Sequence, residues 1–182
     1  YEIYQCDWSS DVCSSDLDKF YNEVVSPRVK WQIEPSTIRP EDNKDGQNDF
    51  MFLSAQFIGN NLSIQPTSHI ILNLLSKFQN RTGVKIKDIW RVQGNITTIT
   101  PKGRMNSPWH CDRDVPHHVI LYYINDSDGD TVLRIGDKEE RVTPKKGRFV
   151  VFNGSYVHCG ETPMNTQMRL ILNMNEIGRA HV

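Results

Sequence analysis

The sequence lacks any long apolar run. No stretch of its 182 residues approaches the roughly 20 apolar residues that a membrane-spanning helix needs. The first residues also lack the basic start and apolar stretch of a secretory signal. The sequence also lacks a large excess of charge of one sign, because its formal net charge is −1. We therefore expect neither nucleic acid nor an anionic membrane as a partner. The length suits one domain with one core.

Cysteine is scarce, with four in the chain. Cys6 and Cys13 lie in a terminal segment that we set apart below, and Cys111 and Cys159 have no zinc-type spacing. This pattern excludes a disulfide framework and fits a reducing cytoplasm. We assign neither remaining cysteine to catalysis, because a buried cysteine usually packs as a small apolar side chain.

Both ends of the sequence differ from the rest. Residues 1–17, with the string DWSSDVCSSDL, and residues 177–182, IGRAHV, resemble the translation of a DNA-sequencing library adapter. Two such matches at opposite termini are hard to explain by chance, whereas the alternative is a genuine Ser/Asp-rich flexible terminus. We therefore set both ends aside, as one sets aside a tag, and expect a single domain over residues 18–176.

Residues 18–85 predict a helical and loop support for that domain. Residues 67–80 place apolar side chains at three- and four-residue spacing, which is typical of an amphipathic helix. Thr67 or Ser68 is the expected cap of its start, and Gly83 its expected stop. Elsewhere we expect a short strand, a polar loop and an apolar segment that is either helix or strand, at residues 29–33, 35–48 and 50–58.

The pattern changes to short strands in residues 86–176. Runs of β-branched and aromatic residues alternate with turns rich in Asn, Asp, Gly and Pro. The expected strands are residues 89–100, 119–124, 131–135, 140–142, 148–152 and 169–174. Many short strands at regular spacing predict a mainly β fold with flanking N-terminal helices, a sandwich or barrel of jelly-roll type.

A candidate metal site lies between these strands. His110 and Asp112 form a His-X-Asp pair, and on an extended chain residues two apart point the same way. His158 follows 48 residues later, after enough strands for the chain to fold back and supply a third ligand. Two histidines and one carboxylate leave coordination positions open, as expected for ferrous iron that also binds a co-substrate and O2.

Each part of this pattern is weak alone, since a lone His-X-Asp pair is more often a hydrogen-bonded surface pair. Arg169 strengthens it, because it lies 11 residues after His158 at the start of an apolar strand. A guanidinium in a pocket suits recognition of a carboxylate through two hydrogen bonds. The remaining histidines are read as ordinary polar side chains, with cavity lining by His117 or His118 as a minor alternative.

Further motifs lie between these residues. They are the strand Tyr122-Tyr123-Ile124-Asn125, the turn Asp128-Gly129-Asp130-Thr131 and the segment PKKGRFVVF at residues 144–152. Together with His-X-Asp, the distal histidine and the arginine, they resemble the 2-oxoglutarate and Fe(II)-dependent dioxygenases, specifically the prolyl 4-hydroxylase-like branch in its compact phage and bacterial form. The resemblance covers roughly residues 86–176, and residues 18–85 match only in having an amphipathic helix before the core.

The resemblance implies a double-stranded β-helix, with iron held by His110, Asp112 and His158. It implies that 2-oxoglutarate chelates the iron and that its far carboxylate pairs with Arg169, helped by the Tyr123 hydroxyl. Further co-substrate contacts are expected from Asn95, less so from Thr97, and Asn173 shares a strand face with Arg169; ordinary strand hydrogen bonding is an equal alternative for these three residues.

The implied reaction is hydroxylation of an unactivated C–H bond with O2, releasing succinate and CO2, with ascorbate as a candidate reductant. The substrate is a small molecule or a peptide, with a prolyl or other amino-acid side chain among the candidates, and the sequence is silent on oligomeric state. Two other readings stay open. One is a non-catalytic cupin-like or jelly-roll module that binds metal or a ligand. The other is a zinc or manganese hydrolase, which has no need for a dicarboxylate clamp.

Overall fold

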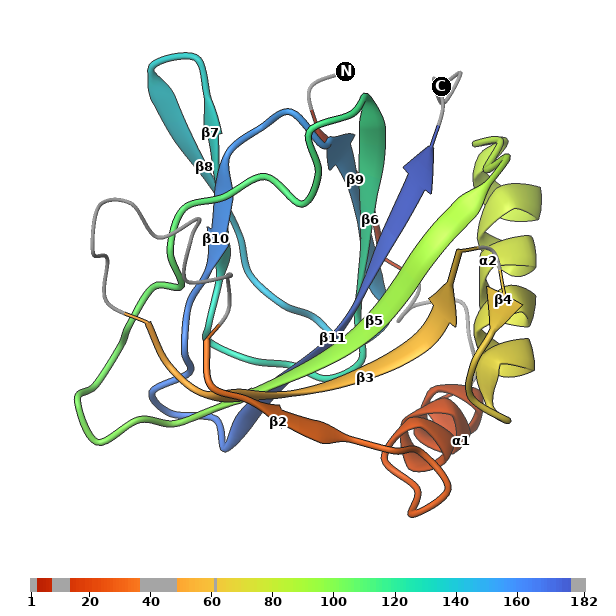
Figure 1. The fold of residues 1–182 in the computed structure, drawn as a ribbon, viewed down its shortest axis with the longest axis horizontal. Coiled ribbons are helices and arrows are strands. Elements are labelled where there is room, and N and C mark those ends of the chain that lie inside the picture. Colours follow the sequence, from red (N-terminus) through yellow and green to blue (C-terminus); the bar gives the residue numbers. More distant parts are fainter. Residues whose placement is uncertain (1–2, 8–13, 37–48, 61, 178–182) are drawn as a thin grey trace.

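The computed structural model describes residues 3–7, 14–36, 49–60 and 62–177. Two antiparallel sheets face each other and enclose a cavity, and two helices cover the outer face of the larger sheet (Figure 1). The expected mainly β jelly roll with flanking N-terminal helices is therefore confirmed. The expected polar loop at residues 35–48 falls almost entirely outside the described residues.

The larger sheet has eight strands in the order β1-β9-β6-β11-β5-β3-β2, with β4 paired to β3. Its strands, in chain order, are β1 (Ile3–Asp7), β2 (Gln32–Glu34), β3 (Phe52–Gly59), β4 (Leu62–Ser63), β5 (Ile89–Thr98), β6 (His117–Tyr123), β9 (Arg148–Asn153) and β11 (Met168–Ile177). The last strand lies at the centre, between β5 and β6, which fixes its position from both sides.

The smaller sheet has three strands in the order β10-β7-β8. The hairpin of β7 (Thr131–Ile135) and β8 (Lys138–Val142) turns at Gly136, whose φ of 58° lies in the left-handed region that glycine adopts without strain. The third strand, β10 (His158–Gly160), pairs with β7 and carries one of the expected metal ligands into the cavity.

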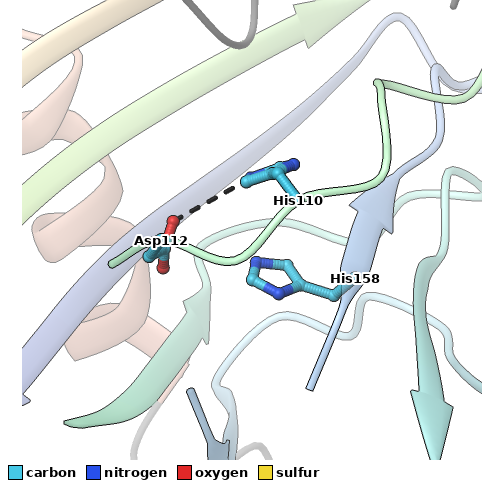
Figure 2. A group of neighbouring side chains, drawn as sticks. All are labelled: His110, Asp112 and His158. Carbon is cyan, nitrogen blue, oxygen red and sulfur yellow. Dashed lines mark ion pairs between the residues drawn. The ribbon is translucent and has the colours of Figure 1, made fainter. Parts of the chain in front are cut away.

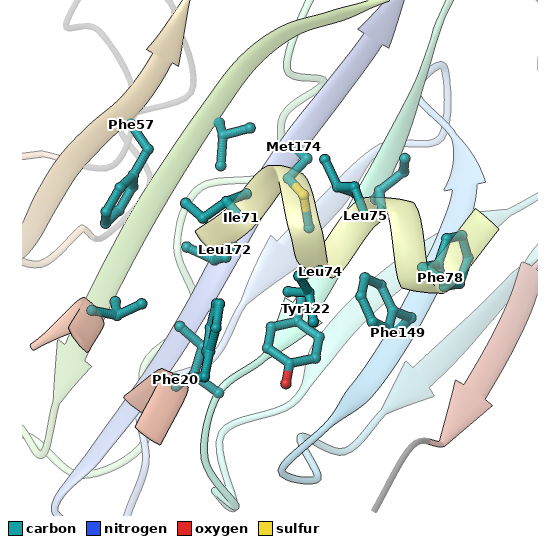
Figure 3. Close-up of a cluster of buried hydrophobic side chains, with 14 of the residues drawn as sticks. Phe20, Phe57, Ile71, Leu74, Leu75, Phe78, Tyr122, Phe149, Leu172 and Met174 are labelled. Atoms are coloured by element: carbon teal, nitrogen blue, oxygen red, sulfur yellow. The ribbon is translucent and has the colours of Figure 1, made fainter. Parts of the chain in front are cut away.

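The helices α1 (Ser14–Val24) and α2 (Ser68–Thr82) pack on the outer face of the larger sheet. Figure 3 shows their apolar side chains against those of the strands, including Phe20, Ile71, Leu74 and Phe78 from the helices and Tyr122, Phe149, Leu172 and Met174 from the sheet. Since successive strand residues point to opposite faces, the outer residues of β11 build this core and the inner ones face the cavity.

The helix expected at residues 67–80 is confirmed, with Gly83 as its C-cap in the left-handed conformation at φ 74°. Thr67 takes the expected N-cap position, but only through its backbone. Thr67 makes no side-chain capping hydrogen bond, and the Ser68 hydroxyl instead donates to the Phe57 carbonyl of β3 at 2.6 Å. A tertiary contact to the sheet has therefore taken the hydroxyl that the sequence assigned to the cap.

The ambiguous segment at residues 50–58 is strand β3. The strand expected at residues 29–33 lies slightly further along the chain, as β2. The sequence missed α1, β1, β4 and β10. Helix α1 begins at Ser14, inside the adapter-like segment, and Leu17 is buried. Strand β1 also comes from that segment and pairs with β9 from Arg148 to Phe152. Among the described residues, no helix combines the length and the apolar character that crossing a bilayer would require.

Candidate metal centre

His110, Asp112 and His158 lie close together, as Figure 2 shows, and the two histidines line a cavity between the sheets. One potential ligand atom from each falls within 4.8 Å of the others, and His110 Nε2 lies 3.9 Å from Asp112 Oδ1. The two histidines meet because an isolated antiparallel bridge joins their backbones. His110 N–H donates to the His158 carbonyl at 3.1 Å, and His158 N–H donates back at 2.9 Å.

Backbone carbonyls set the orientation of both imidazoles. His110 Nδ1 lies 2.8 Å from the Pro108 carbonyl, and His158 Nδ1 lies 3.0 Å from the Tyr156 carbonyl. A carbonyl only accepts, so each Nδ1 carries the proton and each Nε2 keeps a free lone pair. Burial also lowers the pKa of His158, which favours the neutral imidazole that a metal ion requires.

The Asp112 carboxylate is buried and surrounded by donors. The Asn173 amide donates to it at 3.1 Å and the Asn175 amide at 2.9 Å, while Arg91 Nη2 lies 3.4 Å from Oδ1. Burial alone would raise the pKa of Asp112, but the charges of His158, Arg91 and His110 and the hydrogen bond from Asn175 outweigh it and hold the pKa below its usual range. The carboxylate is therefore ionised and fixed before any metal ion arrives.

Arg169 lies at the other end of the same cavity and is 4% exposed. Its Nη2 donates to the Thr131 hydroxyl oxygen at 2.6 Å, and its Nε has no hydrogen-bond partner among the described residues. No carboxylate in the described part of the chain forms an ion pair with it, and burial lowers its pKa. A buried guanidinium without a counter-ion is costly, so this end of the cavity is built to receive an anion.

Thr131 connects Arg169 to Tyr123. The Tyr123 hydroxyl donates to Thr131 Oγ1 at 2.7 Å, so this oxygen accepts from both neighbours. Its own proton is then free to point into the cavity that Thr131 lines. Tyr123 is fully buried and does not itself line the cavity, but its ring lies beside the guanidinium, whose carbon is 5.8 Å from the ring centre.

Asn95 and Thr97 line the cavity from β5, where Thr97 stands opposite Arg169 and Asn95 stands opposite Ile171. The Asn95 side-chain oxygen is buried and has no partner among the residues that the structure describes, whereas a polar atom in such a place normally has one. The other lining residues are Phe50, Phe52, Ser107, Leu121, Cys159, Gly160 and Ile171. An unsatisfied acceptor in the middle of the cavity is a further sign of a ligand site.

Cys159 is fully buried beside His158, and burial raises its pKa to about 12. Cys111 is partly buried, and burial raises its pKa as well. Both thiols are therefore protonated near neutral pH and are poor metal ligands, since a metal ion binds the thiolate. This agrees with leaving them out of the metal site.

All the residues expected at the site lie in or beside this cavity, with the metal ligands at one end and Arg169 at the other. The sequence missed Thr131, Asn175 and Arg91 as site residues. Asn175 follows Asn173 by two on a strand that was already expected, so alternation along β11 was the available signal. Nothing in the sequence marked Arg91, which reaches Asp112 only through the pairing of β5 with β11.

No family model matches the sequence, and no curated protein does so at a significant level. Solved structures do match in fold. A 2OG-Fe(II) oxygenase family oxidoreductase from Burkholderia pseudomallei gives a TM-score of 0.74 at 13% identity, over 98% of this chain and 87% of that one.

Two prolyl hydroxylases match as well, each with a TM-score of 0.62. One is a prolyl-4-hydroxylase from Pseudomonas putida, at 15% identity over 98% of this chain and 94% of that one. The other, from Trichoplax adhaerens, is in complex with a hypoxia inducible factor peptide and matches at 13% identity over 96% of this chain and 83% of that one. The chain therefore has the jelly-roll fold found in 2-oxoglutarate oxygenases and prolyl hydroxylases.

Proposed function

We propose that the chain is an Fe(II)- and 2-oxoglutarate-dependent dioxygenase that hydroxylates an unactivated C–H bond. The observation that carries this proposal is one cavity with two unlike ends. A two-histidine, one-carboxylate cluster stands at one end and the uncompensated guanidinium of Arg169 at the other. A co-substrate with a metal-chelating head and an anionic tail matches both ends at once.

The donor set fits Fe(II). His110 and His158 present neutral Nε2 atoms, and Asp112 presents an ionised carboxylate, which together form the facial set that leaves positions open. When bound there with 2-oxoglutarate, iron supplies the O2 chemistry, which oxidises the co-substrate to succinate and CO2 and hydroxylates the substrate. The protein's own part is to hold these groups in place and to exclude water.

The spacing along β11 fits a five-carbon dicarboxylate. Arg169 and Asn173 lie four residues apart on the same face, which corresponds to about 13 Å of strand. Asn173 donates to Asp112, so this length separates the tail clamp from the anchor of the metal ligand. We assign the far carboxylate of 2-oxoglutarate to Arg169 and Thr131, and a donor such as a hydroxyl group to the unpartnered Asn95 oxygen.

The competing functions account for less of the site. A hydrolase with the same three ligands leaves the buried Arg169 without a role. A non-catalytic jelly-roll module leaves unexplained why both imidazoles and the carboxylate are prearranged around open positions. Peptides remain candidate substrates, because one matching structure holds a peptide, and small molecules remain candidates beside them.

The test is the weak visible charge-transfer band that a bidentate 2-oxo acid gives on ferrous iron. We expect the anaerobic protein to develop the band with Fe(II) and 2-oxoglutarate. Asp112→Ala should abolish it, because the metal loses a ligand. Arg169→Gln should weaken 2-oxoglutarate binding about ten-fold or more, since it removes a buried charge-assisted pair.

Arg134→Gln is the matched control, because Arg134 is half exposed and outside the cavity. Thermal unfolding provides a second measurement, since a ligand present at 100 times its Kd stabilises the fold by about 2.7 kcal/mol. A folded wild-type protein that shows neither the band nor a thermal shift would contradict the oxygenase assignment and favour the non-catalytic module.

A further inference from the structure

A bulge in β5 places two neighbouring side chains near the metal ligands. Along the pairing with β11, Arg91 stands opposite Asn175 and Ile89 stands opposite Glu176, so Trp90 is the extra residue. A β-bulge breaks the regular alternation and re-aims a side chain, and such bulges occur often beside active sites. Trp90 and Arg91 therefore make different contacts.

Arg113 covers Trp90. It directly follows Asp112 in the chain, and its guanidinium carbon lies 3.4 Å from the centre of the Trp90 ring. Its Nη1 is buried and has no hydrogen-bond partner in the described part of the chain, and no described acidic residue pairs with it. The stacking holds the guanidinium in place but leaves its charge without a described counter-ion and its Nη1 group without an acceptor.

Arg91 stands on the other side of Asp112. Its Nε donates to the Asn175 side-chain oxygen at 2.9 Å, its Nη2 lies 3.4 Å from Asp112 Oδ1, and its side chain is 26% exposed. Trp90, Arg91 and Arg113, which we call the rim cluster, thus gather around one metal ligand.

The charges of the assembled site do not balance. With Fe(II) and the 2-oxoglutarate dianion bound, the charges of these two groups cancel each other. Asp112 offsets one of the three guanidinium charges of Arg91, Arg113 and Arg169, which leaves two positive charges in and beside the cavity. Such a surplus attracts an anion, and the low local dielectric strengthens that attraction.

The part of the surplus that belongs to Arg91 and Arg113 lies away from the co-substrate clamp. Asn175, which stands opposite Arg91, is six residues beyond Arg169 on β11, or about 20 Å of strand. The chain after Arg113 runs out to the surface through exposed residues 114–116. The rim cluster therefore lies beside Asp112 and outside the lining of the cavity that holds the co-substrate clamp.

We propose that the rim cluster binds an anionic group of the primary substrate, a carboxylate or a phosphate, and so directs a nearby C–H bond to the metal. This inference rests on the proposed function for its chemistry. The binding site itself rests on the free N–H of Arg113, the partly exposed Arg91 and the Trp90 face that fixes Arg113.

A second Arg–Trp stack in the protein provides the matched control. The guanidinium carbon of Arg134 lies 3.6 Å from the centre of the Trp109 ring, next to His110 in sequence. Unlike Arg113, it pairs with an acid, since its Nε lies 3.1 Å from Glu139 Oε1. Its charge is already neutralised, so removing it should not affect anion binding.

The full chain is loaded with Mn(II) and 2-oxoglutarate and titrated with acetate or with methyl phosphate at constant ionic strength. Binding is followed by tryptophan fluorescence and calorimetry. We expect one of the two anions to bind saturably, which identifies the anionic group. Arg113→Gln should weaken that binding about ten-fold or more, and Arg113→Lys should restore part of it. Arg134→Gln should leave it unchanged.

Two results would overturn the proposal. One is a wild-type protein that binds 2-oxoglutarate but neither anion. The other is equal anion binding by wild type and by a folded Arg113→Gln. If the charge-transfer band is absent but anion binding still depends on Arg113, the anion site stands and the oxygenase assignment fails, so the two outcomes are distinguishable.

Discussion

At the scale of single residues, the position of the Asp112 carboxylate depends on two asparagines of β11. Asn175 has no freedom to turn, because its side-chain oxygen accepts from Arg91 and its NH2 group must then face Asp112. Asn173 donates to the same carboxylate, and Asn175 also donates to Asn173 at 3.3 Å. The metal ligand is thus oriented by a short chain of amides whose last member is held by an arginine.

Asn175→Ala should therefore weaken metal binding, because the carboxylate loses the donor that fixes its direction. Loss of such a supporting hydrogen bond typically costs 10- to 100-fold in metal affinity, so we expect a loss of about ten-fold or more for Mn(II), measured by calorimetry. Asn73→Ala, on the exposed face of α2, is the control. Equal Mn(II) affinity in both variants would mean that Asp112 is held without Asn175.

The sequence predicted the metal ligands and Arg169 because each belongs to a short motif with a fixed chemical purpose. It did not predict Thr131, Arg91 or Asn175 as site residues, because their roles depend on which strands become neighbours. The hydroxyl of Thr131, for example, acquires its role only when β7 is brought beside Arg169. Residue chemistry is local in the sequence, whereas the partners that orient it are not.

At the scale of elements, those with a local sequence signal were also predicted, whereas those that depend on pairing were not. The apolar spacing of residues 67–80 predicted α2 because one helix face carries its own signal. A three-residue strand such as β10 carries almost none, and it forms through pairing with β7 and through the bridge to His110. The apolar segment that became β3 was ambiguous because one face packs on the helices and the other borders the cavity.

Phe78 is the residue of α2 with which we would test the role of this helix. It is fully buried, and its ring stacks on Phe149 with centroids 4.4 Å apart. Phe78→Ala should lower the free energy of unfolding by about 3–5 kcal/mol, because it removes apolar contact and leaves a cavity. Chemical denaturation measures this loss.

Leu72→Ala on the same helix is the control, since Leu72 is 45% exposed and should change stability by no more than about 0.5 kcal/mol. Both variants should bind Mn(II) like wild type, because the metal site is on the opposite face of the sheet. Similar losses of stability in the two variants would show that α2 does not pack through Phe78.

At the scale of the whole molecule, the larger sheet separates stability from chemistry. Leu170, Leu172 and Met174 of β11 face the helices and build the core, while Arg169 and Asn173 face the cavity. One strand therefore fixes the distance between the metal ligands and the co-substrate clamp from within a rigid sheet. This arrangement predicts that changes at the edge of the sheet affect stability more than binding.

The adapter-like N-terminal segment tests that expectation, because it supplies β1 at one edge of the sheet. Its backbone pairs with β9, and Asp7 pairs with Arg148 through a hydrogen bond of 2.8 Å. Neither strand contributes a residue to the lining of the cavity. We propose that residues 18–176 carry the function, so that removing β1 should lower stability and leave metal and 2-oxoglutarate binding intact.

Two truncated chains separate the contributions. A chain that begins at Ser14 loses β1 but keeps Leu17, whereas a chain that begins at Asp18 also loses that buried side chain, which is 7% exposed. We expect Tm to fall in the first and further in the second, by about 2–4 °C for each kcal/mol lost, as calorimetry would show. Mn(II) affinity should stay at the wild-type value in both, because the metal triad and Arg169 are held by β5, β7, β10 and β11. If the chain that begins at Asp18 folds but no longer binds Mn(II), the segment belongs to the functional domain despite its adapter-like sequence.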